Sequence, residues 1–205
     1  IYNKGWNLIY TLPVDPSLIP LAPDIDQGNL FASIFLNTPD TNIYYFVTKR
    51  SAYSALYSQV FGNFGVRYIY IYIYKLDTRL NGNQGGVFGI DTLAFLTDTF
   101  SDSRLNAVRH SNGKDWWISC SGSNSNIYHT FLYSDKLIQR DTQKIGLQMA
   151  LSDITRSNIC FSQTGNKVAM YKPVGGPIRY PPDWVLELLD FDRCTGKMSN
   201  LKSLD

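Results

Sequence analysis

Hydrophobic and polar positions alternate along much of the chain, and this period of two predicts β-strands. The clearest case is residues 67–75, RYIYIYIYK, where tyrosine and isoleucine alternate without a break. Successive side chains of a strand point to opposite faces, so the tyrosines are expected on one face and the isoleucines on the other. Three interpretations follow: an inner strand of a sheet, a tyrosine ladder that stacks on a sugar or peptide, or a zipper-forming aggregation hazard.

The same pattern predicts further short strands. Residues 1–10 indicate a strand, a turn and a second strand, and residues 30–37 and 42–49 indicate a hairpin around a Pro-Asp turn. Residues 51–65 have near-helical spacing and fit a turn of helix or a loop. The remaining strands are predicted at residues 87–90, 93–96, 105–110, 116–120, 127–133, 137–140, 145–151, 159–162, 167–172, 185–192 and 197–201.

Three long connections interrupt the strands. Residues 15–27 and 173–182 are rich in proline, and residues 77–86 are rich in glycine and asparagine. Loops of this length on a rigid scaffold are common sites of recognition. We therefore expect binding residues in these loops, including Tyr180 in the last of them.

Composition favours an all-β fold and excludes some partners. Of the 17 acidic residues only Glu187 is a glutamate, whereas the chain has 14 tyrosines, which is unlike a helical protein. The net charge of +2 comes from scattered residues, so nucleic-acid binding is not expected. No apolar run approaches the roughly 20 residues of a membrane span, so none is predicted.

The cysteines form an odd set of three, Cys120, Cys160 and Cys194. Their spacing matches no zinc-binding pattern. One disulfide plus one thiol would suit a secreted protein, but single cysteines in apolar strands favour three small buried side chains.

A weak internal repeat distinguishes between β architectures. Residues 107–118 and 160–171 both contain an apolar strand, a turn with Asn and Gly, and a second strand, and their starts lie 53 residues apart. This spacing is near the length of one propeller blade. It favours a β-propeller built of antiparallel meander sheets over a sandwich.

Four segments carry a resemblance to a known group of proteins. They are residues 107–118 (AVRHSNGKDWWI), 127–133 (IYHTFLY), 160–169 (CFSQTGNKVA) and 188–196 (LLDFDRCTG). Residues 1–4, 28–36, 42–46 and 75–77 follow in the same order upstream. Together they resemble secreted proteins of Bacteroidota that carry a WD40-like β-propeller and a C-terminal sorting domain for type IX secretion.

The resemblance implies that residues 1–205 are a single propeller region, about four blades of a larger ring, in a fragment of a longer chain. It also implies an extracellular or cell-surface module that acts in binding, adhesion or assembly of a surface structure, with a protein or glycan partner or the secretion machinery. The chain departs from the group in two ways. The sorting domain is absent, and the usual Ser-Pro-Asp-Gly turn is Ser-Gln-Thr-Gly, which places Thr164 where an aspartate caps the turn.

Candidate catalytic groups are few. The two histidines, His110 and His129, lie among strand and turn residues, so both are interpreted as structural. Asp190 and Asp192 alternate along one predicted strand and share a face, whereas Glu187 lies an odd number of residues away, on the other face. That offset argues against the carboxylate pair of a glycosidase, and Asp192 is expected to cap the following turn.

Metal and nucleotide sites are not expected either. In residues 77–86 the candidate oxygen ligands are Asp77, Asn81 and Asn83, and no bidentate acid completes a calcium site. No phosphate-binding glycine motif occurs at a strand-to-helix junction. We predict no cofactor, no metal and no catalytic residue.

Trp116 and Trp117 are adjacent in a predicted strand and must face opposite sides of the sheet. One is expected in the core between blades. The other is favoured to pack against the next blade, and the alternative is exposure at a blade face or rim, where an aromatic side chain can anchor a partner. The predicted binding residues are Trp117, Trp116, Asp77, Asn81, Asn83 and Tyr180. Two alternatives to a binding module stay open: a propeller-fold hydrolase acting on glycans, and a subunit of a surface appendage or secretion complex.

Overall fold

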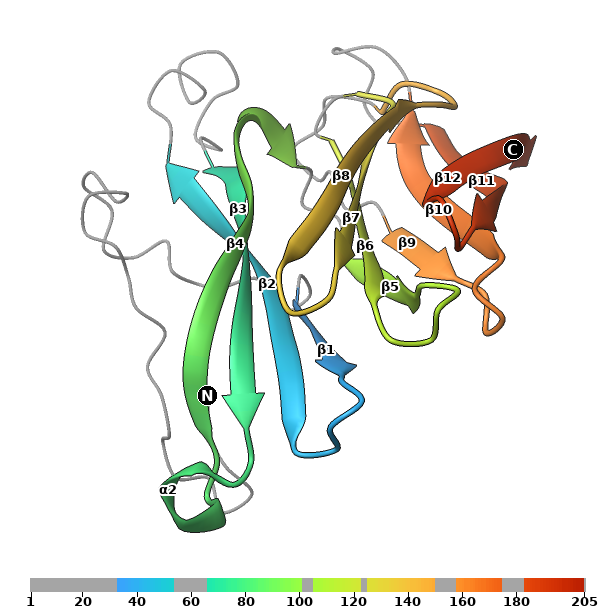
Figure 1. Cartoon of the computed structure of the whole chain (residues 1–205). Helices are drawn as coiled ribbons and strands as arrows, with labels where there is room; N and C mark the ends of the chain where they lie inside the picture. The colour runs from blue at the N-terminus through green and yellow to red at the C-terminus, as the bar shows by residue number, and fades with distance from the viewer. Residues whose placement is uncertain are drawn as a thin grey trace. The chain divides into compact units, whose positions relative to one another are not determined.

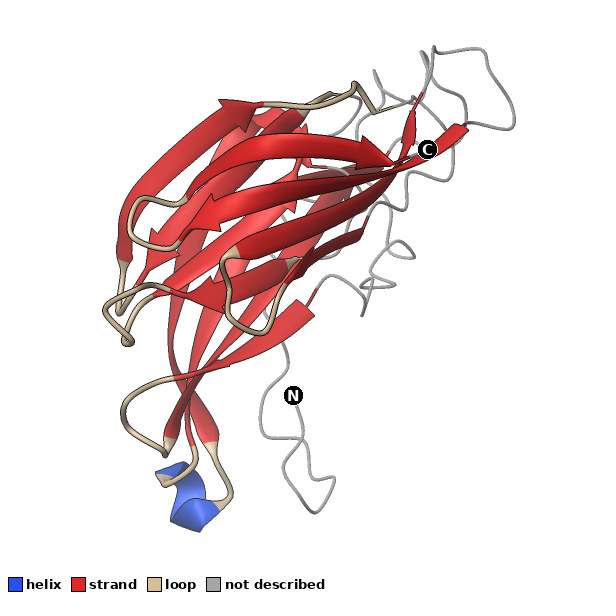
Figure 2. Cartoon of the chain, turned by 90° about the vertical axis from the view of Figure 1, so that its right-hand side faces the viewer, coloured by secondary structure: helices blue, strands red, loops and turns tan. Residues whose placement is uncertain are grey.

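The chain is almost entirely β-strand in the parts that the structure, a computed structural model, describes. These parts are residues 33–53, 66–100, 105–122, 125–149, 158–174 and 183–204, with the backbone alone in residues 50–53, 66–70 and 94–100. A four-residue helix is the one other regular element among them (Figures 1 and 2). The all-β prediction is confirmed. No helix in the described ranges has the length and apolarity to cross a bilayer.

The strands form three four-stranded antiparallel sheets in which sequential strands are neighbours. The first sheet contains β1 (Ser33–Asn37), β2 (Ile43–Tyr53), β3 (Val66–Asp77) and β4 (Gly86–Phe100), with helix α2 (Leu80–Asn83) between the last two. The second contains β5 (Asn106–Arg109), β6 (Trp116–Ser121), β7 (Ile127–Tyr133) and β8 (Leu137–Lys144). The third contains β9 (Asn158–Phe161), β10 (Lys167–Val174), β11 (Asp183–Asp192) and β12 (Lys197–Leu204). The predicted meander is confirmed.

The chain divides into two compact units, Ile1–Phe95 and Leu96–Asp205. The sheet β1–β4 belongs chiefly to the first unit, and the sheets β5–β8 and β9–β12 make up the second. The prediction of a single propeller region over residues 1–205 stays a prediction.

Four expectations for individual segments need correction. β2 continues to Tyr53, so residues 51–53 are strand, and residues 54–65 lie outside the described parts. The two short strands predicted at 87–90 and 93–96 are one strand, β4, in which the polar Asp91 pairs with Lys75 of β3 at 2.9 Å. The predicted loop 77–86 contains α2. The predicted hairpin 1–10 and the loop 15–27 also lie outside the described residues.

The predicted strand 145–151 is absent from the described residues 145–149. Gly146 has φ of +77°, a left-handed conformation that ends a strand, and only an isolated bridge between Met149 and Val174 follows. These residues form a strap that leaves β8 and lies against the end of β10.

The tyrosine–isoleucine segment is an inner strand, as expected, because β3 pairs with β2 on one side and lies beside β4 on the other. Ile71 and Ile73 are fully buried, and Tyr74 is 1% exposed. Tyr72 is half-buried and contacts Tyr74, which in turn contacts Phe46. The tyrosines at 72 and 74 are therefore packed within an aromatic row instead of forming an open ladder. The side chains of residues 68 and 70 lie outside the described set.

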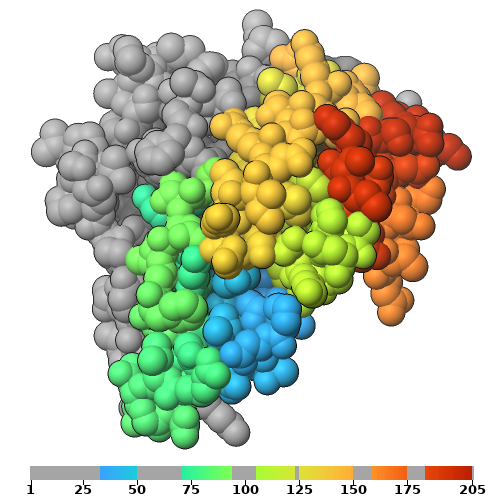
Figure 3. Space-filling view, in the orientation of Figure 1, coloured from blue at the N-terminus to red at the C-terminus, as the bar shows by residue number. Residues whose placement is uncertain are grey.

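Within the second unit the sheets β5–β8 and β9–β12 lie side by side and share one core (Figures 1 and 3). Strands β6 and β7 contribute the aromatic side, including Trp117 and Tyr128, and β10 and β11 contribute aliphatic side chains such as Val168, Met170 and Leu189. Each is at most 2% exposed. Alternation along each strand thus places one face of each sheet in the shared core.

The two sheets of the second unit repeat one turn. In β5–β6 the N–H of Gly113 donates to His110 O at 2.9 Å, and in β9–β10 the N–H of Gly165 donates to Ser162 O at 2.9 Å. Both glycines have left-handed φ, +73° and +75°. Gly113 and Gly165 occupy the same place in the two turns, so residues that lie 52 positions apart are equivalent in the two sheets. The repeat length read from the sequence, 53 residues, is one residue longer than this structural repeat. A difference of one matters because it would assign each strand residue to the opposite face of the sheet.

Candidate functional site

Three turns meet at one end of the second unit. They are the β5–β6 turn (residues 110–115), the β9–β10 turn (162–166) and the β11–β12 turn (192–196), and together we call them the three-turn cluster. Their sequences lie in three of the segments that carry the resemblance. Of the predicted binding residues, Trp116 and Trp117 lie in one of these segments, and Asp77, Asn81, Asn83 and Tyr180 lie outside them.

Arg193 connects the three turns. Its Nε donates to Arg109 O at 2.7 Å, one terminal nitrogen donates to Thr164 O at 3.1 Å, and the other donates to His110 O at 3.3 Å. A guanidinium presents its donors in a fixed planar fork, so three carbonyl acceptors fix its position. The β11–β12 turn is thereby tied to both other turns and to the neighbouring sheet.

Trp117 contacts the β11–β12 turn through its indole ring. Its Nε1 donates to Arg193 O at 2.8 Å, and the N–H of Ser111 donates to the same oxygen at 3.1 Å. Gly196, at φ +73°, lies against the indole so closely that a Cβ there would come within 2.6 Å of the ring. Both its φ and this contact require glycine.

His110 completes the contact between the turns. The N–H of Asn112 donates to its Nδ1 at 3.0 Å, and its Nε2 lies 3.2 Å from Cys194 O. Because a carbonyl can only accept, these partners select the neutral tautomer with hydrogen on Nε2. The structural role predicted for His110 is confirmed.

Asp192 caps the β11–β12 turn, as predicted. Its carboxylate accepts from the N–H of Cys194 at 2.8 Å and from the Thr195 hydroxyl at 2.7 Å. These bonds, that from the Thr195 hydroxyl first, hold the pKa of Asp192 below its usual value of 3.8. The turn thus has its own cap besides its contacts with the other turns.

The outer surface of the three-turn cluster is polar. Lys114 and Gln163 are exposed at the tips of their turns, and Thr164, Asn166 and Thr195 are exposed beside them. Their backbone is held by the Arg193, Trp117 and His110 contacts. Exposed amide, hydroxyl and ammonium groups on a fixed backbone can hydrogen-bond a polar partner without the cost of ordering the backbone.

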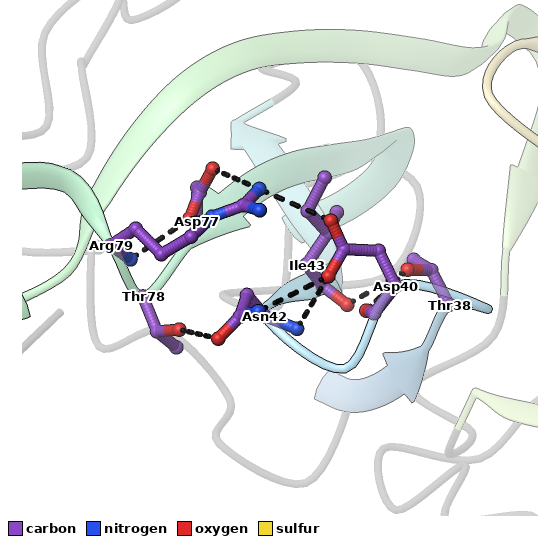
Figure 4. A network of polar contacts seen from close by, with 7 residues as sticks. All are labelled: Thr38, Asp40, Asn42, Ile43, Asp77, Thr78 and Arg79. Carbon is purple, nitrogen blue, oxygen red and sulfur yellow. Dashed lines mark hydrogen bonds and ion pairs between the residues drawn. The ribbon is translucent and has the colours of Figure 1, made fainter.

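The first unit has a separate polar network, at the β1–β2 and β3–α2 turns (Figure 4). Arg79 contacts Asp77 at 2.8 Å and Asp40 at 3.1 Å, and Asp40 also accepts from the N–H of Asn42 at 2.9 Å. Thr78 donates to Asn42 Oδ1 at 3.2 Å. These bonds lower the pKa of Asp77, chiefly through Arg79, and that of Asp40, chiefly through the N–H of Asn42. The network joins two turns through a solvent-exposed arginine.

The predicted binding residues of the first unit are used locally. Asp77 is paired with Arg79, and Asn81 donates to Gly85 O at 3.0 Å. Asn81 and Asn83 both have positive φ, 52° and 65°, a conformation that asparagine tolerates well. Among the described residues, no three His, Cys, Asp or Glu side chains form a group that could hold a metal ion.

The tryptophan pair divides between core and surface. Trp117 is fully buried, so its indole is used in packing and turn support. Trp116 is half-buried, with the guanidinium of Arg109 over its ring at 4.2 Å. Tyr180 lies outside the described residues. The structure brings the two tryptophans to the three-turn cluster and places Asp77, Asn81 and Asn83 in the other unit.

A buried ion pair lies at the other end of the shared core. Lys172 of β10 contacts Glu187 of β11 at 2.7 Å, and both side chains are 0% exposed. The ammonium also donates to Tyr128 Oη at 2.8 Å and to Leu147 O at 2.6 Å. Three donors therefore meet three acceptors. Burial lowers the pKa of Lys172 against the opposing effect of Glu187, and burial and the Glu187 charge raise that of Tyr128.

The pair also holds the strap. The N–H of Leu147 donates to Glu187 Oε1 at 2.7 Å while its carbonyl accepts from Lys172. Gly146 lies so close that a Cβ there would overlap the Glu187 carboxylate. Glu187 thus faces the interior, opposite Asp190 and Asp192, as its spacing predicts. Because Lys172 and Glu187 are fully buried and bonded to each other and to their neighbours, the pair stabilises the fold and does not face a substrate.

The remaining titratable residues have local roles. Asp190 binds Lys167 and accepts from Asn200 at 2.9 Å. His129 is 1% exposed, with Nδ1 3.3 Å from Thr142 Oγ1, as expected of a structural residue. Cys120 is buried as predicted, whereas Cys160 and Cys194 are exposed thiols. The expectation of burial was wrong for these two because Cys160 faces outward on an edge strand and Cys194 occupies a turn.

Comparisons with known proteins add little. No protein-family model and no curated protein matches the chain. Among solved structures, the periplasmic gluconolactonase PpgL of Pseudomonas aeruginosa is similar at 12% identity and a TM-score of 0.38, over 87% of this chain and 57% of that chain. The chain thus spans a little over half the length of that protein.

Replacing Arg193 tests its role in the three-turn cluster. Arg193→Ala removes three hydrogen bonds from a charged donor and should lower the free energy of unfolding by about 2–4 kcal/mol, measured by urea denaturation. Arg193→Lys should recover little, because an ammonium cannot reproduce the fork. Lys136→Ala, in an exposed turn, is the control. Equal midpoints for Arg193→Ala and the control would contradict the role assigned to Arg193.

The Asp192 cap can be tested by titration. We expect NMR of the carboxyl carbon to give a pKa below 3.8, and Thr195→Val to raise it, because the hydroxyl is its strongest partner. Cys194→Ser should change it less, since the N–H of Cys194, which this substitution keeps, contributes more than the Cys194 side chain. A lowered pKa means stability present above the unfolded pKa and lost as pH falls through the folded one. A pKa that does not respond to Thr195→Val would refute the assignment.

The buried pair predicts non-additive mutations. Lys172→Met or Glu187→Leu alone strands a charge in the core and should cost about 3–5 kcal/mol in urea denaturation. The double variant should be more stable than either single one, because no charge is then left unpaired. The exposed pair Lys167–Asp190 on the same two strands is the matched control, and Lys167→Met with Asp190→Leu should change little. Additive losses at 172 and 187 would contradict this coupling.

Proposed function

We propose that the protein is a secreted or cell-surface β-propeller module that acts in binding, adhesion or assembly of a surface structure and is exported by type IX secretion. The observation that carries the binding role is the three-turn cluster. It combines exposed polar side chains with a backbone held by Arg193, Trp117 and Gly196. The export route and the Bacteroidota affiliation are supported by the resemblance of the motifs.

The blade assignment is supported by the repeat in the second unit. Each sheet is a four-stranded meander, and the step of 52 residues relates them. With this step, Trp116 corresponds to Val168 and Trp117 to Ala169. Trp117 of one sheet and Val168 of the next lie in the shared core, so the two sheets contact through non-equivalent faces. Contact of this kind is expected when successive sheets are related by rotation, as in a propeller.

Binding is favoured over catalysis by the use of the candidate acids and bases. Glu187 and His129 are buried, and Asp192 caps a turn. A glycan hydrolase needs two carboxylates facing one substrate, and Glu187 faces away from both aspartates of its strand. These positions support a recognition module ahead of the hydrolase alternative.

A binding assay on two turn tips tests the proposal. The variant Lys114→Ala/Gln163→Ala removes exposed side chains from two turns of the cluster and leaves its backbone contacts intact. The probe is an array of bacterial and host glycans, followed by calorimetry with the oligosaccharide that binds best. We expect an affinity loss of about tenfold, equivalent to about 1.4 kcal/mol, from two contacts at an interface.

The matched control is Lys144→Ala/Lys202→Ala, two exposed residues away from the cluster, which should bind like the parent. Binding that the tip variant leaves unchanged, or an array without any ligand, would count against a glycan-binding cluster. Release of reducing sugar from the bound oligosaccharide would favour the hydrolase alternative instead.

A further inference from the structure

A row of polar side chains crosses the apolar core between the two sheets of the second unit. The strand register places Asn106, Ser119, Thr130 and Asp141 directly opposite one another on β5, β6, β7 and β8. Ser119 lies two residues from Trp117, which belongs to the shared core, so the row is on the side of its sheet that faces the sheet β9–β12. We call these four residues the polar row.

The two ends of the polar row are bonded to the facing sheet. Asn106 donates through Nδ2 to Ile159 O of β9 at 2.9 Å, and Asp141 contacts Lys197 Nζ of β12 at 2.7 Å. Strands β9 and β12 are the first and last strands in the order of that sheet. The polar row is thereby held at both margins of the interface.

The two central members of the row are buried hydroxyls. Ser119 is 0% exposed and Thr130 is 1% exposed, and neither hydroxyl oxygen has a hydrogen-bond partner among the described residues. A hydroxyl that is buried in this way gives up its bonds to solvent and gains none in return, which opposes folding. Residues in one cross-strand pair have Cβ atoms about 4.5–5.5 Å apart, so a single small molecule can reach both hydroxyls.

The facing sheet directs chiefly apolar side chains at this pair. Val168, Met170 and Leu189 lie in the shared core and carry no strong hydrogen-bonding group. Lys172 and Glu187 of the same strands are buried as well, but they bond each other and the strap at the other end of the core. The two hydroxyls therefore need a partner that comes from neither sheet.

We propose that Ser119 and Thr130 form a binding site for one internal water molecule between the two sheets. Water suits the pair because it is small and neutral and can donate to or accept from either hydroxyl. An ion would meet only neutral groups at this position and would keep its desolvation cost. The water joins the two central residues, so that the polar row is bonded at its middle as well as at its ends. This site is separate from the three-turn cluster and does not depend on the binding role proposed for it.

Oxygen-17 relaxation dispersion of the solvent tests the site in the whole chain. The method counts water molecules that stay bound for longer than the protein takes to tumble, and hydroxyl protons do not contribute to it. Thr130→Val removes the hydroxyl at nearly constant volume and should lower the count by one water per protein. Thr130→Ser keeps a hydroxyl and should retain that water. Ser203→Ala removes an exposed hydroxyl from β12 and should leave the count unchanged.

Urea denaturation of the same variants supplies a second measurement. Ser119→Ala and Thr130→Val should each lower the midpoint, because each leaves the water with a single hydroxyl partner, and the loss in the double variant should be smaller than the sum. Midpoints that rise in both single variants would show that the hydroxyls have no partner at all, and would overturn the proposal. Lower midpoints with an unchanged water count in Thr130→Val would show that the two hydroxyls bond each other, and would overturn it as well. Neither measurement involves a glycan, so failure of the glycan-binding assay leaves this test intact.

Discussion

The second unit depends on the way Arg193 and Trp117 join two sheets at a single turn. Trp117 of the sheet β5–β8 points into the shared core, and its indole donates to Arg193 O. The side chain of Arg193 in turn donates to carbonyls at the β5–β6 and β9–β10 turns. Gly196 allows the indole to lie close against the turn. Hydrophobic burial alone would let two sheets slide, whereas directional bonds to fixed carbonyls set one register between them.

Polar groups complement the apolar core at both ends of this interface. At one end the bonds are exposed or half-buried, and they support a surface that can meet a partner. At the other end Lys172, Glu187 and Tyr128 are buried and satisfy each other and the strap. The apolar residues between the two ends provide the driving force, and the polar residues specify which sheet packs where.

Alternation of side chains made much of this fold predictable. It located most of the strands, the inner position of the tyrosine–isoleucine strand and the opposite faces of Glu187 and Asp190. It could not show that Gly146 ends a strand, because alternation reveals neither the left-handed φ of Gly146 nor its close contact with Glu187. Nor could it give Lys172 or Arg193 a role, since Arg193 binds backbone carbonyls of other turns and Lys172 binds Glu187, Tyr128 and one carbonyl, all on other segments of the chain. The signal for the three-turn cluster was present in its distinctive motifs.

The strap has a consequence for the order of folding. Until Leu147 reaches the pair, Glu187 lacks its backbone donor and Lys172 one of its acceptors, so bringing the sheets together first would trap charges without full solvation. A partly assembled core then has a higher free energy than either the separate sheets or the fully folded unit. Sheet docking and strap ordering are thereby coupled into one cooperative event, which limits the lifetime of intermediates that expose strand edges.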